Sequence, residues 1–397
     1  YSGFLIGMGA GVNVLTARFI GAREEENTRQ TVHTAAVVCL GLGMILMALC
    51  FTLARPLLTL LGTKDELIDG AILYLRIYGF GLPAMALYNF GSAVLTATGD
   101  TKRPLLFLSI AGGLNICLNL FFVIVCHMSV DGVATATVIS QYISLFLVVR
   151  CLCRSEGLSH LELKEIRLDK EESIRMIQIG FPAGLQSMLF SISNVLVQSS
   201  VNSFGASVVA ANTAASNIEG FIYTAMNSVF HAAITFTSQN LGAGKLSRTK
   251  RVYGSCIATS LMIGLPMCLV YFLFAPSLLS IYVSSADPSY QDVINYGLIR
   301  MRWLGCFQFL GGLMEDACGM VRGLGKSWLP MFVTGIGACL SRIIWIYTVF
   351  QAVHTPEILY LSYPLSWILT ALMHVVCFIL TYRKLEKLLA NRPSAAT

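Results

Sequence analysis

Long apolar runs repeat along this chain from one end to the other. Eleven of them are about 20 residues long or longer, which is enough for a helix to cross the hydrocarbon core of a bilayer. Only 12% of the 397 residues are charged, about half the share found in soluble domains. We therefore predict an all-α polytopic membrane protein. The predicted spans are 2–21, 33–54, 71–97, 104–126, 131–153, 174–202, 211–241, 253–274, 293–321, 330–350 and 358–382.

Basic residues alternate between the two sides of these spans. One set of connections holds 21 Lys or Arg, whereas the opposite set holds only Arg55 and Lys64. Because cytoplasmic loops are enriched in Lys and Arg, the first set and the C-terminus are predicted to be cytoplasmic. The net charge of +6 then follows from topology, and we expect no nucleic-acid partner. The basic connections are 16–32, 99–103, 150–175, 242–252, 322–329 and 382–397.

The start of the chain lies on the other side. An odd number of crossings places Tyr1 outside, and the opening stretch "YSGFLIGMGAGV" is already part of a span. No signal peptide precedes it. We expect a fragment that lacks its first transmembrane helix.

Two distant stretches are similar at one constant offset. "TARFIGAREEENTRQT" (16–31) and "TSQNLGAGKLSRTKRV" (237–252) match at an offset of 221, with Gly21 over Gly242 and Thr28 over Thr249. "TGDTKRP" (98–104) then matches "RGLGKSWLP" (322–330), with Gly99 over Gly323. Six crossings separate the copies, so they point the same way and form a parallel repeat. We predict an N-lobe over 1–153 with five of its six helices, a cytoplasmic linker over 154–173, and a six-helix C-lobe over 174–397.

Polar side chains follow helical spacing inside several spans. An ionisable residue in a span is costly and by default faces a cavity or a partner, whereas Ser, Asn and Gln either line a cavity or join helices by hydrogen bonds. The ion-coupling candidates are Glu219, Glu315, Asp316, Asn115 and Asn119. The substrate-cavity candidates are Gln186, Ser191, Asn194, Gln198, Tyr223, Asn227 and Gln308.

The three acids differ in their surroundings. Glu219 has no basic residue within one turn of its own span, which favours a position facing a cavity. For Glu315 and Asp316 the alternatives stay open, because several arginines are available to neutralise them. These are Arg300, Arg302, Arg322 and Arg342.

Other classes of chemistry lack their motifs. The twelve cysteines are scattered, and the close pair Cys151 and Cys153 has no second pair to complete a zinc site. We expect no metal site and no cofactor. No P-loop or catalytic motif is present, so the chain is not expected to be an enzyme, and any uphill transport must use an ion gradient.

The order of several motifs resembles the multidrug and toxic compound extrusion (MATE) family, bacterial type, along the whole chain. The resemblance implies two six-helix lobes in a V, a central cavity, and antiport of organic, often cationic, drugs against H⁺ or Na⁺. The motifs are "GMGAGVNVLTARFIGAREEENTRQ", "LTATGDTKRP", "LNICLNLFFV", "VDGVATATVISQ", "GFPAGLQSMLFSISNVLVQ", "FTSQNLGAGKLSRTKRV" and "MVRGLGKSWLP".

Three positions depart from the family's pattern of coupling acids. Asn115 is followed four residues later by Asn119, where the family often has Asp. Phe190 and Gly311 stand where one branch of the family has Glu and Asp. The resemblance therefore points to coupling through the N-lobe or through other acids, among which Glu219 is our first choice.

These observations together predict a multidrug antiporter in the bacterial inner membrane, working as a monomer. A drug cation and H⁺ or Na⁺ would compete for one carboxylate, and aromatic and Met side chains would hold the flat, lipophilic part of the drug. A flippase for lipid-linked oligosaccharides would need a more basic cavity than the N-lobe spans offer. A membrane-embedded enzyme or a scaffold would need a catalytic cluster or a large soluble portion.

Overall fold

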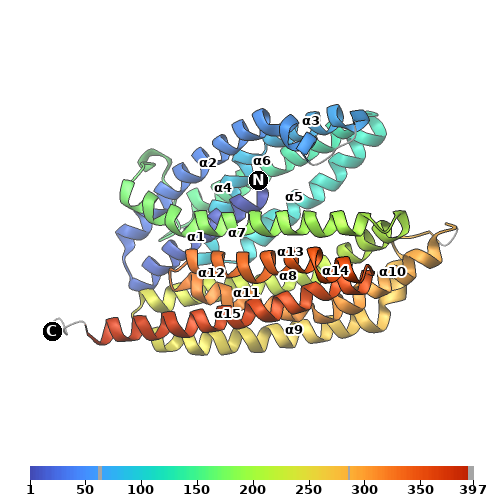
Figure 1. The fold of residues 1–397 in the computed structure, drawn as a ribbon. Helices are drawn as coiled ribbons and strands as arrows, with labels where there is room; N and C mark the ends of the chain where they lie inside the picture. Colours follow the sequence, from blue (N-terminus) through green and yellow to red (C-terminus); the bar gives the residue numbers. More distant parts are fainter. Residues whose placement is uncertain (61–64, 285–286, 392–397) are drawn as a thin grey trace. The chain divides into compact units, whose positions relative to one another are not determined.

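The computed structural model describes residues 1–60, 65–284 and 287–391, and its regular elements are all helices (Figure 1). The predicted all-α fold is confirmed for these residues. Each of the eleven predicted spans corresponds to one helix or to a chain of consecutive helices. Lys64 and residues 392–397, which entered the charge count, lie outside the described residues.

Contacts divide the chain into two compact units, Tyr1–Gly184 and Leu185–Thr397. The first unit contains short connections and one helix that continues into the second unit. Its elements are α1 (Ser2–Ala22), α2 (Glu25–Leu60), α3 (Asp65–Gly79), α4 (Leu82–Ala97), α5 (Lys102–Leu120), η1 (Phe121–Val125), α6 (Val130–Arg154), η2 (Leu163–Glu165) and the first half of α7 (Lys170–Asn202).

The second unit begins inside α7 and ends with a long helix. Its remaining elements are α8 (Ala206–Gly242), α9 (Leu246–Ser280), α10 (Tyr290–Trp303), η3 (Gly305–Phe307), α11 (Gln308–Gly323), α12 (Trp328–Thr334), η4 (Gly335–Leu340), α13 (Ser341–Tyr347), α14 (Val349–Ala352) and α15 (Pro356–Ala390).

Several helix pairs that meet in one unit have counterparts in the other. In unit 1, α4 packs against α1, α2 and α6, and α3 packs against α2 and α6. In unit 2, α11 packs against α8, α9 and α15, and α10 packs against α9 and α15. These contacts correspond when the helices are paired in chain order, which supports the predicted parallel repeat. The helix α10 also packs against α8, a contact that has no comparable counterpart between α1 and α3.

The repeat extends to single hydrogen bonds at the ends of α1 and α8. Arg23 N–H donates to the carbonyl of Ile20 and Glu24 N–H to that of Phe19, with Arg23 in the left-handed region. At an offset of 221, Gly244 N–H donates to Leu241 and Lys245 N–H to Asn240, with Gly244 in the left-handed region. These are the paired bonds with which a helix commonly ends.

The second predicted match was wrong by two residues. Gly99 and Gly325 both follow a helix in the left-handed region, and each donates to the carbonyl three residues earlier. Gly99 therefore corresponds to Gly325 and not to Gly323. The error arose because Gly323 and Gly325 stand two apart, and the sequence alone does not show which of them adopts a positive φ.

Two of the predicted spans are broken by tight turns. The helices α3 and α4 meet at a bend of 45°, just before Pro83, and the short η3 separates α10 from α11. Of the described helices, eight are long and apolar enough to cross a membrane, or nine if α3 and α4 form one span. The predicted spans 211–241 and 293–321 are not among them. The helix α8 carries many polar side chains, and the second span is divided into α10 and α11, which have only 14 and 16 residues.

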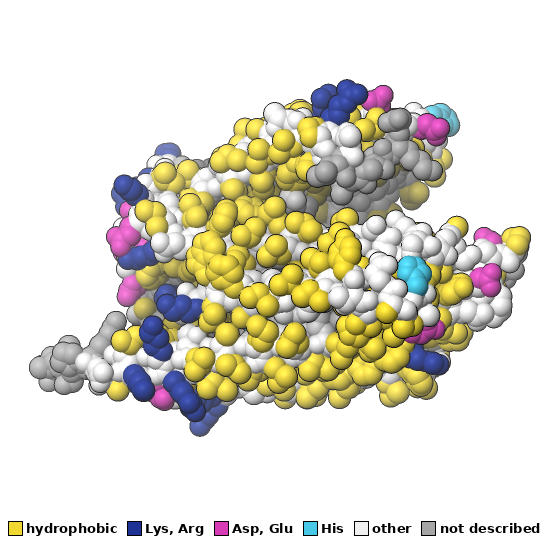
Figure 2. Space-filling view, in the orientation of Figure 1, with side chains coloured by type: hydrophobic (Ala, Val, Ile, Leu, Met, Phe, Trp, Pro, Cys, Tyr) yellow, Lys and Arg dark blue, Asp and Glu magenta, His cyan; other side chains and the backbone are white. Residues whose placement is uncertain are grey.

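The outward surface of unit 2 suits a lipid environment. Figure 2 shows hydrophobic side chains along α9 and α15, and Lys and Arg side chains at the C-terminal end of α15. On α9, Met262 and Phe272 are among the exposed large apolar side chains. This distribution is the one expected of helices that pass through a bilayer.

The boundary between the units falls at Gly184, inside the helix that was predicted to open the C-lobe. The first half of α7 lies against α1, where a Cβ atom added to Gly11 would stand 2.8 Å from the backbone of Gly180. A Cβ atom added to Gly7 would stand 2.3 Å from the backbone nitrogen of Gly184. Small residues allow the two backbones to approach closely, so this part of α7 belongs to unit 1 by contact.

Candidate ion-coupling and substrate site

Glu219 on α8 is paired with an arginine from another helix. Its Oε2 accepts a hydrogen bond of 2.7 Å from Nη2 of Arg300 on α10, and both side chains are buried, with exposed fractions of 6% and 8%. The guanidinium also lies 5.4 Å from the centre of the Tyr360 ring. Glu219 has no basic residue within one turn of its own span, and its basic partner comes from another helix, 81 residues further along the chain.

Asn212 connects this ion pair to two further helices. Its Oδ1 accepts from Nη1 of Arg300 at 2.6 Å and from the hydroxyl of Tyr360 at 3.2 Å. Its Nδ2 donates to Oε1 of Gln198 at 2.8 Å, and Gln198 donates in turn to Asn202 at 2.9 Å. The structure thus brings together two predicted residues, Glu219 and Gln198, in a network that joins α7, α8, α10 and α15.

Asp316 is completely buried and has no cationic partner. Its Oδ2 accepts a hydrogen bond of 2.6 Å from the hydroxyl of Ser260 on α9. Its Oδ1 has no hydrogen-bond partner, and no Lys, Arg or His nitrogen lies within 4.0 Å of the carboxyl group, among the residues described. The neighbouring Glu315 is only half-buried and interacts electrostatically with Tyr223 on α8.

The other two buried arginines that were considered as partners of these acids form hydrogen bonds to neutral groups, although Arg322 also interacts electrostatically with Glu315. Arg322 donates to Oε1 of Gln186 at 2.5 Å, and Arg342 donates to the hydroxyl of Ser366 at 2.9 Å. The Arg342 guanidinium also stacks 4.1 Å from the centre of the Tyr363 ring. Neither arginine neutralises Asp316.

Gln186, a predicted cavity residue, is buried, and both polar atoms of its side chain form hydrogen bonds. Besides accepting from Arg322, it donates from Nε2 to the hydroxyl of Thr334 at 3.0 Å. Thr334 also contacts His374 at 3.2 Å between hydroxyl oxygen and Nε2. These contacts join α7, α11, α12 and α15, so Gln186 holds helices of unit 2 together.

Within the described part of the chain, the remaining cavity candidates form no hydrogen bond to the Glu219–Arg300 network. Ser191, Asn194 and Tyr223 are exposed within unit 2, and the exposed fraction of Tyr223 reaches 54%. Asn227 and Gln308 are half-buried. Their role in lining a cavity stays a prediction.

Asn115 and Asn119 on α5 bind each other. Nδ2 of Asn119 donates to Oδ1 of Asn115 at 3.0 Å, and Nδ2 of Asn115 lies 3.4 Å from the hydroxyl of Thr137 on α6. No acid takes part in these bonds. The pair links two helices of unit 1, and its role in coupling stays a prediction.

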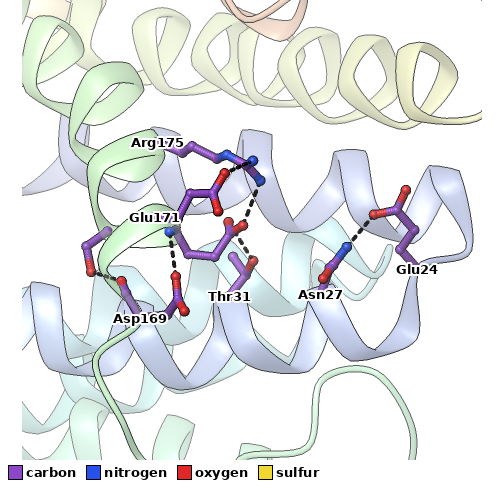
Figure 3. A network of polar contacts seen from close by, with 8 residues as sticks. Glu24, Asn27, Thr31, Asp169, Glu171 and Arg175 are labelled. Atoms are coloured by element: carbon purple, nitrogen blue, oxygen red, sulfur yellow. Dashed lines mark hydrogen bonds and ion pairs between the residues drawn. The ribbon is translucent and has the colours of Figure 1, made fainter.

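A second polar network lies at the predicted cytoplasmic end of unit 1 (Figure 3). Glu172, near the start of α7, accepts from Arg175 at 2.8 Å and from Thr31 on α2 at 3.3 Å. Arg175 also pairs with Glu171. On the same side, His33 accepts the backbone N–H of Glu162 at 3.1 Å. The predicted linker is therefore held to α2 near its middle and near its C-terminal end.

The MatE family model matches residues 1–121 and 182–348. This chain belongs to the MatE family. The matched ranges include Asn115, Glu219, Arg300 and Asp316, but not Tyr360 on α15. The resemblance noted in the motifs is thereby confirmed, and the chain is assigned to a family of multi-pass membrane transporters rather than of enzymes.

Individual members of the MatE family are similar at low identity. The chain is 28% identical to the probable multidrug resistance protein YoeA of Bacillus subtilis over 72% of this chain and 64% of that protein. It is 28% identical to the probable multidrug resistance protein YpnP of Bacillus subtilis over 81% of this chain and 71% of that protein. The alignment with YoeA thus spans less than two thirds of that relative.

A crystal structure of a MATE protein in complex with MaL6 has the same fold. It superposes with a TM-score of 0.87 at 21% identity, over 98% of this chain and 86% of that one. At this level of sequence identity, the similarity establishes a shared fold but not a shared substrate or mechanism. The two-lobe, all-helical architecture predicted from the MatE resemblance is therefore confirmed.

In this MatE chain, sequence reasoning missed the partners of the acids. Arg300 was considered only for Glu315 and Asp316, and it pairs with Glu219 instead. An arginine inside a span is expected to have a buried partner. Arg300 could therefore be identified as paired from the sequence, but its acidic partner could not. Ser260 and Tyr360 carried no such signal, because single Ser and Tyr residues are common in membrane helices.

Proposed function

We propose that this chain forms a secondary active exporter that moves lipophilic, often cationic, organic compounds out of the cell in exchange for H⁺ or Na⁺. The proposal places it in the bacterial inner membrane as a monomer, with its C-terminus in the cytoplasm. Membership of the MatE family supports export, and so do two relatives that are named as probable multidrug resistance proteins.

The observation that carries ion coupling is the presence of buried acids within the helices of unit 2. Glu219 and Asp316 are both buried, and an ionisable residue inside a membrane helix is expensive and by default functional. Because such a group exists in two charge states, it allows a cation to bind at one stage of a transport cycle and leave at another.

Substrate binding is assigned to side chains that are exposed within unit 2. Tyr223 offers an aromatic face, which attracts organic cations, and it lies near Glu315, whose charge would balance theirs. The exposed Asn194 and Ser191 would add hydrogen bonds. A flat, lipophilic cation is the substrate class that fits this combination of aromatic, acidic and neutral polar groups.

Dye transport with separately imposed gradients tests this function. Everted membrane vesicles containing the natural protein, whose cytoplasmic face points outward, would be given ethidium in the outer solution. A pH gradient, acidic inside, or a Na⁺ gradient, higher inside, would be applied alone. We expect protein-dependent ethidium transport with one of the gradients, and its loss when that gradient is collapsed by an ionophore. Equal ethidium movement in vesicles with and without the protein, under both gradients, would overturn the proposal for this substrate class.

A further inference from the structure

We propose that Asp316, hydrogen-bonded by Ser260, is the proton-binding site of unit 2, and that binding of a substrate cation releases its proton. The inference rests on the proposed export function and deepens it by naming the coupling ion and the residues that hold it. It concerns a position different from Gly311, where one branch of the family has its acid.

Charge balance distinguishes Asp316 from Glu219. The carboxylate of Glu219 has the guanidinium of Arg300 at 2.7 Å, so its negative charge is compensated within unit 2. Asp316 has only the hydroxyl of Ser260. A buried carboxylate without a cation or a full set of hydrogen bonds is costly by several kcal/mol, and such a group takes up a proton instead.

The hydrogen bonds of Asp316 leave a place for the proton. Ser260 donates to Oδ2 at 2.6 Å, whereas Oδ1 is buried and has no partner among the residues described. A carboxylic acid needs fewer hydrogen bonds than a carboxylate, which has about four lone-pair sites to satisfy. The neutral acid therefore fits this site better than the anion.

The number of oxygen atoms favours H⁺ over a metal cation at this position. A hard cation such as Ca²⁺ or Mg²⁺ takes about six or more oxygen ligands, and Na⁺ is likewise bound by several. Asp316 and Ser260 supply three side-chain oxygens between them, and no group of three His, Cys, Asp or Glu suited to a metal occurs in the described part of the chain. A proton needs one oxygen only.

The ionisable groups around Asp316 are few. Tyr253 and Cys256 on α9 interact electrostatically with it, as does Glu315 on its own helix. On the other helices packed against α11, His231 of α8 and His374 of α15 interact with Arg322 rather than with Asp316. Among the residues described, Glu315 is the one acid that interacts electrostatically with Asp316, and its half-buried position near Tyr223 offers a route by which a bound organic cation affects the proton.

Proton release measured on purified protein tests the proposal without transport. The natural protein in detergent would be titrated with ethidium in weakly buffered solution containing a pH indicator. We expect ethidium to release protons from the wild type, and Asp316→Asn to bind ethidium without releasing them. Because Asn resembles the neutral acid in size and charge, Asp316→Asn is expected to unfold at nearly the wild-type temperature.

Two further variants and a spectroscopic signal separate this role from others. Infrared difference spectra between high and low pH should contain the band of a protonated carboxyl group, lost in Asp316→Asn and retained in the matched control Glu315→Gln. Ser260→Ala should keep the band, shift its frequency, and move the pH at which it titrates.

The two proposals fail in different ways. If wild-type protein neither binds nor transports ethidium, the proposed function fails for that substrate, and the infrared band still decides whether Asp316 holds a proton. If Asp316→Asn releases protons as the wild type does, or leaves the carboxyl band unchanged, the assignment to Asp316 is overturned.

Discussion

Oε2 of Glu219 and Nη2 of Arg300 lie 2.7 Å apart inside unit 2, and the charge of each residue is compensated by the other. The remaining carboxylate oxygen of Glu219 and Nε of Arg300 have no hydrogen-bond partner among the residues described. The pair is therefore held by one strong contact and by Asn212. This arrangement makes each partner depend on the other.

Removing one charge of this pair should destabilise unit 2. Glu219→Gln leaves the Arg300 guanidinium buried without an anion, and breaking a buried ion pair costs about 3–5 kcal/mol. We expect a clear fall in the temperature of thermal unfolding in detergent. The double variant Glu219→Gln/Arg300→Gln should recover most of the loss, because no unpaired charge then remains.

Arg302 supplies the matched control for this experiment. It lies on the same helix two residues from Arg300 but is exposed, and it forms no ion pair with any residue that the structure describes. Arg302→Gln removes the same charge and should leave the unfolding temperature unchanged. If the double variant folds well but no longer transports ethidium, Glu219 has a role in transport beyond stability. If the double variant transports ethidium as the wild type does, Glu219 contributes to the stability of the protein and not to transport.

Replacing Gln186 should lower the stability of the protein and leave its substrate preference unchanged. Its side chain binds Arg322 and Thr334 in the interior, and a lost buried hydrogen bond to a charged group costs about 1–3 kcal/mol. Gln186→Leu is therefore expected to lower the unfolding temperature while the order of preference among a panel of dyes stays the same.

Asn194 gives the contrasting case. It is exposed on the same helix and was predicted to line the same cavity. Asn194→Ala should keep the unfolding temperature and change the order of dye preference. The reverse result, an altered preference in Gln186→Leu and none in Asn194→Ala, would contradict the assignment of Gln186 to helix packing.

Much of the fold could be predicted from the sequence, because its signals are local. The length of an apolar run determines a span, and the ends of α1 and α8 share a Gly-Ala pair, Gly21-Ala22 and Gly242-Ala243, at one offset. The break between α10 and α11 was not predicted, since residues 304–307 contain no proline and resemble the rest of the span.

The acids of the candidate site could be identified from the sequence, but their partners could not. Glu219, Glu315 and Asp316 were selected because an acid in an apolar run is conspicuous. Which acid meets which arginine depends on distances between helices, and four arginines were available for three acids. Only packing shows that Arg300 reaches Glu219 and that Asp316 meets Ser260 instead.

The close approach of α1 and α7 predicts a size limit at Gly11. A Cβ atom there would stand 2.8 Å from backbone atoms of Gly180, which cannot move without separating the helices. Gly11→Ala should therefore cost about 1–3 kcal/mol, as overpacking commonly does, and lower the unfolding temperature.

Gly112 on α5 is the matched control, since a Cβ atom there would meet nothing within 4 Å. Gly112→Ala should stabilise the helix by up to about 1 kcal/mol. If both variants changed the unfolding temperature equally, the contact between α1 and α7 would not be limited by the size of residue 11.

The start of α7 yields a prediction about local opening. Asp169 directly precedes this helix, and its Oδ1 accepts the backbone N–H of Glu172 at 2.9 Å. Replacing such a capping side chain by Ala costs about 1 kcal/mol. Asp169→Ala should therefore free the first turn of α7 and, with it, the contact of Glu172 with Thr31.

Hydrogen exchange measured by mass spectrometry would detect this opening. Loss of about 1 kcal/mol corresponds to roughly fivefold faster exchange if the amides exchange through local opening. We expect that increase for peptides covering the first turn of α7 in Asp169→Ala. Asp169→Asn keeps an oxygen that caps the helix, so its exchange should match the wild type. Equal acceleration in both variants would show that the charge of Asp169, and not its hydrogen bond to Glu172, holds this end of the helix.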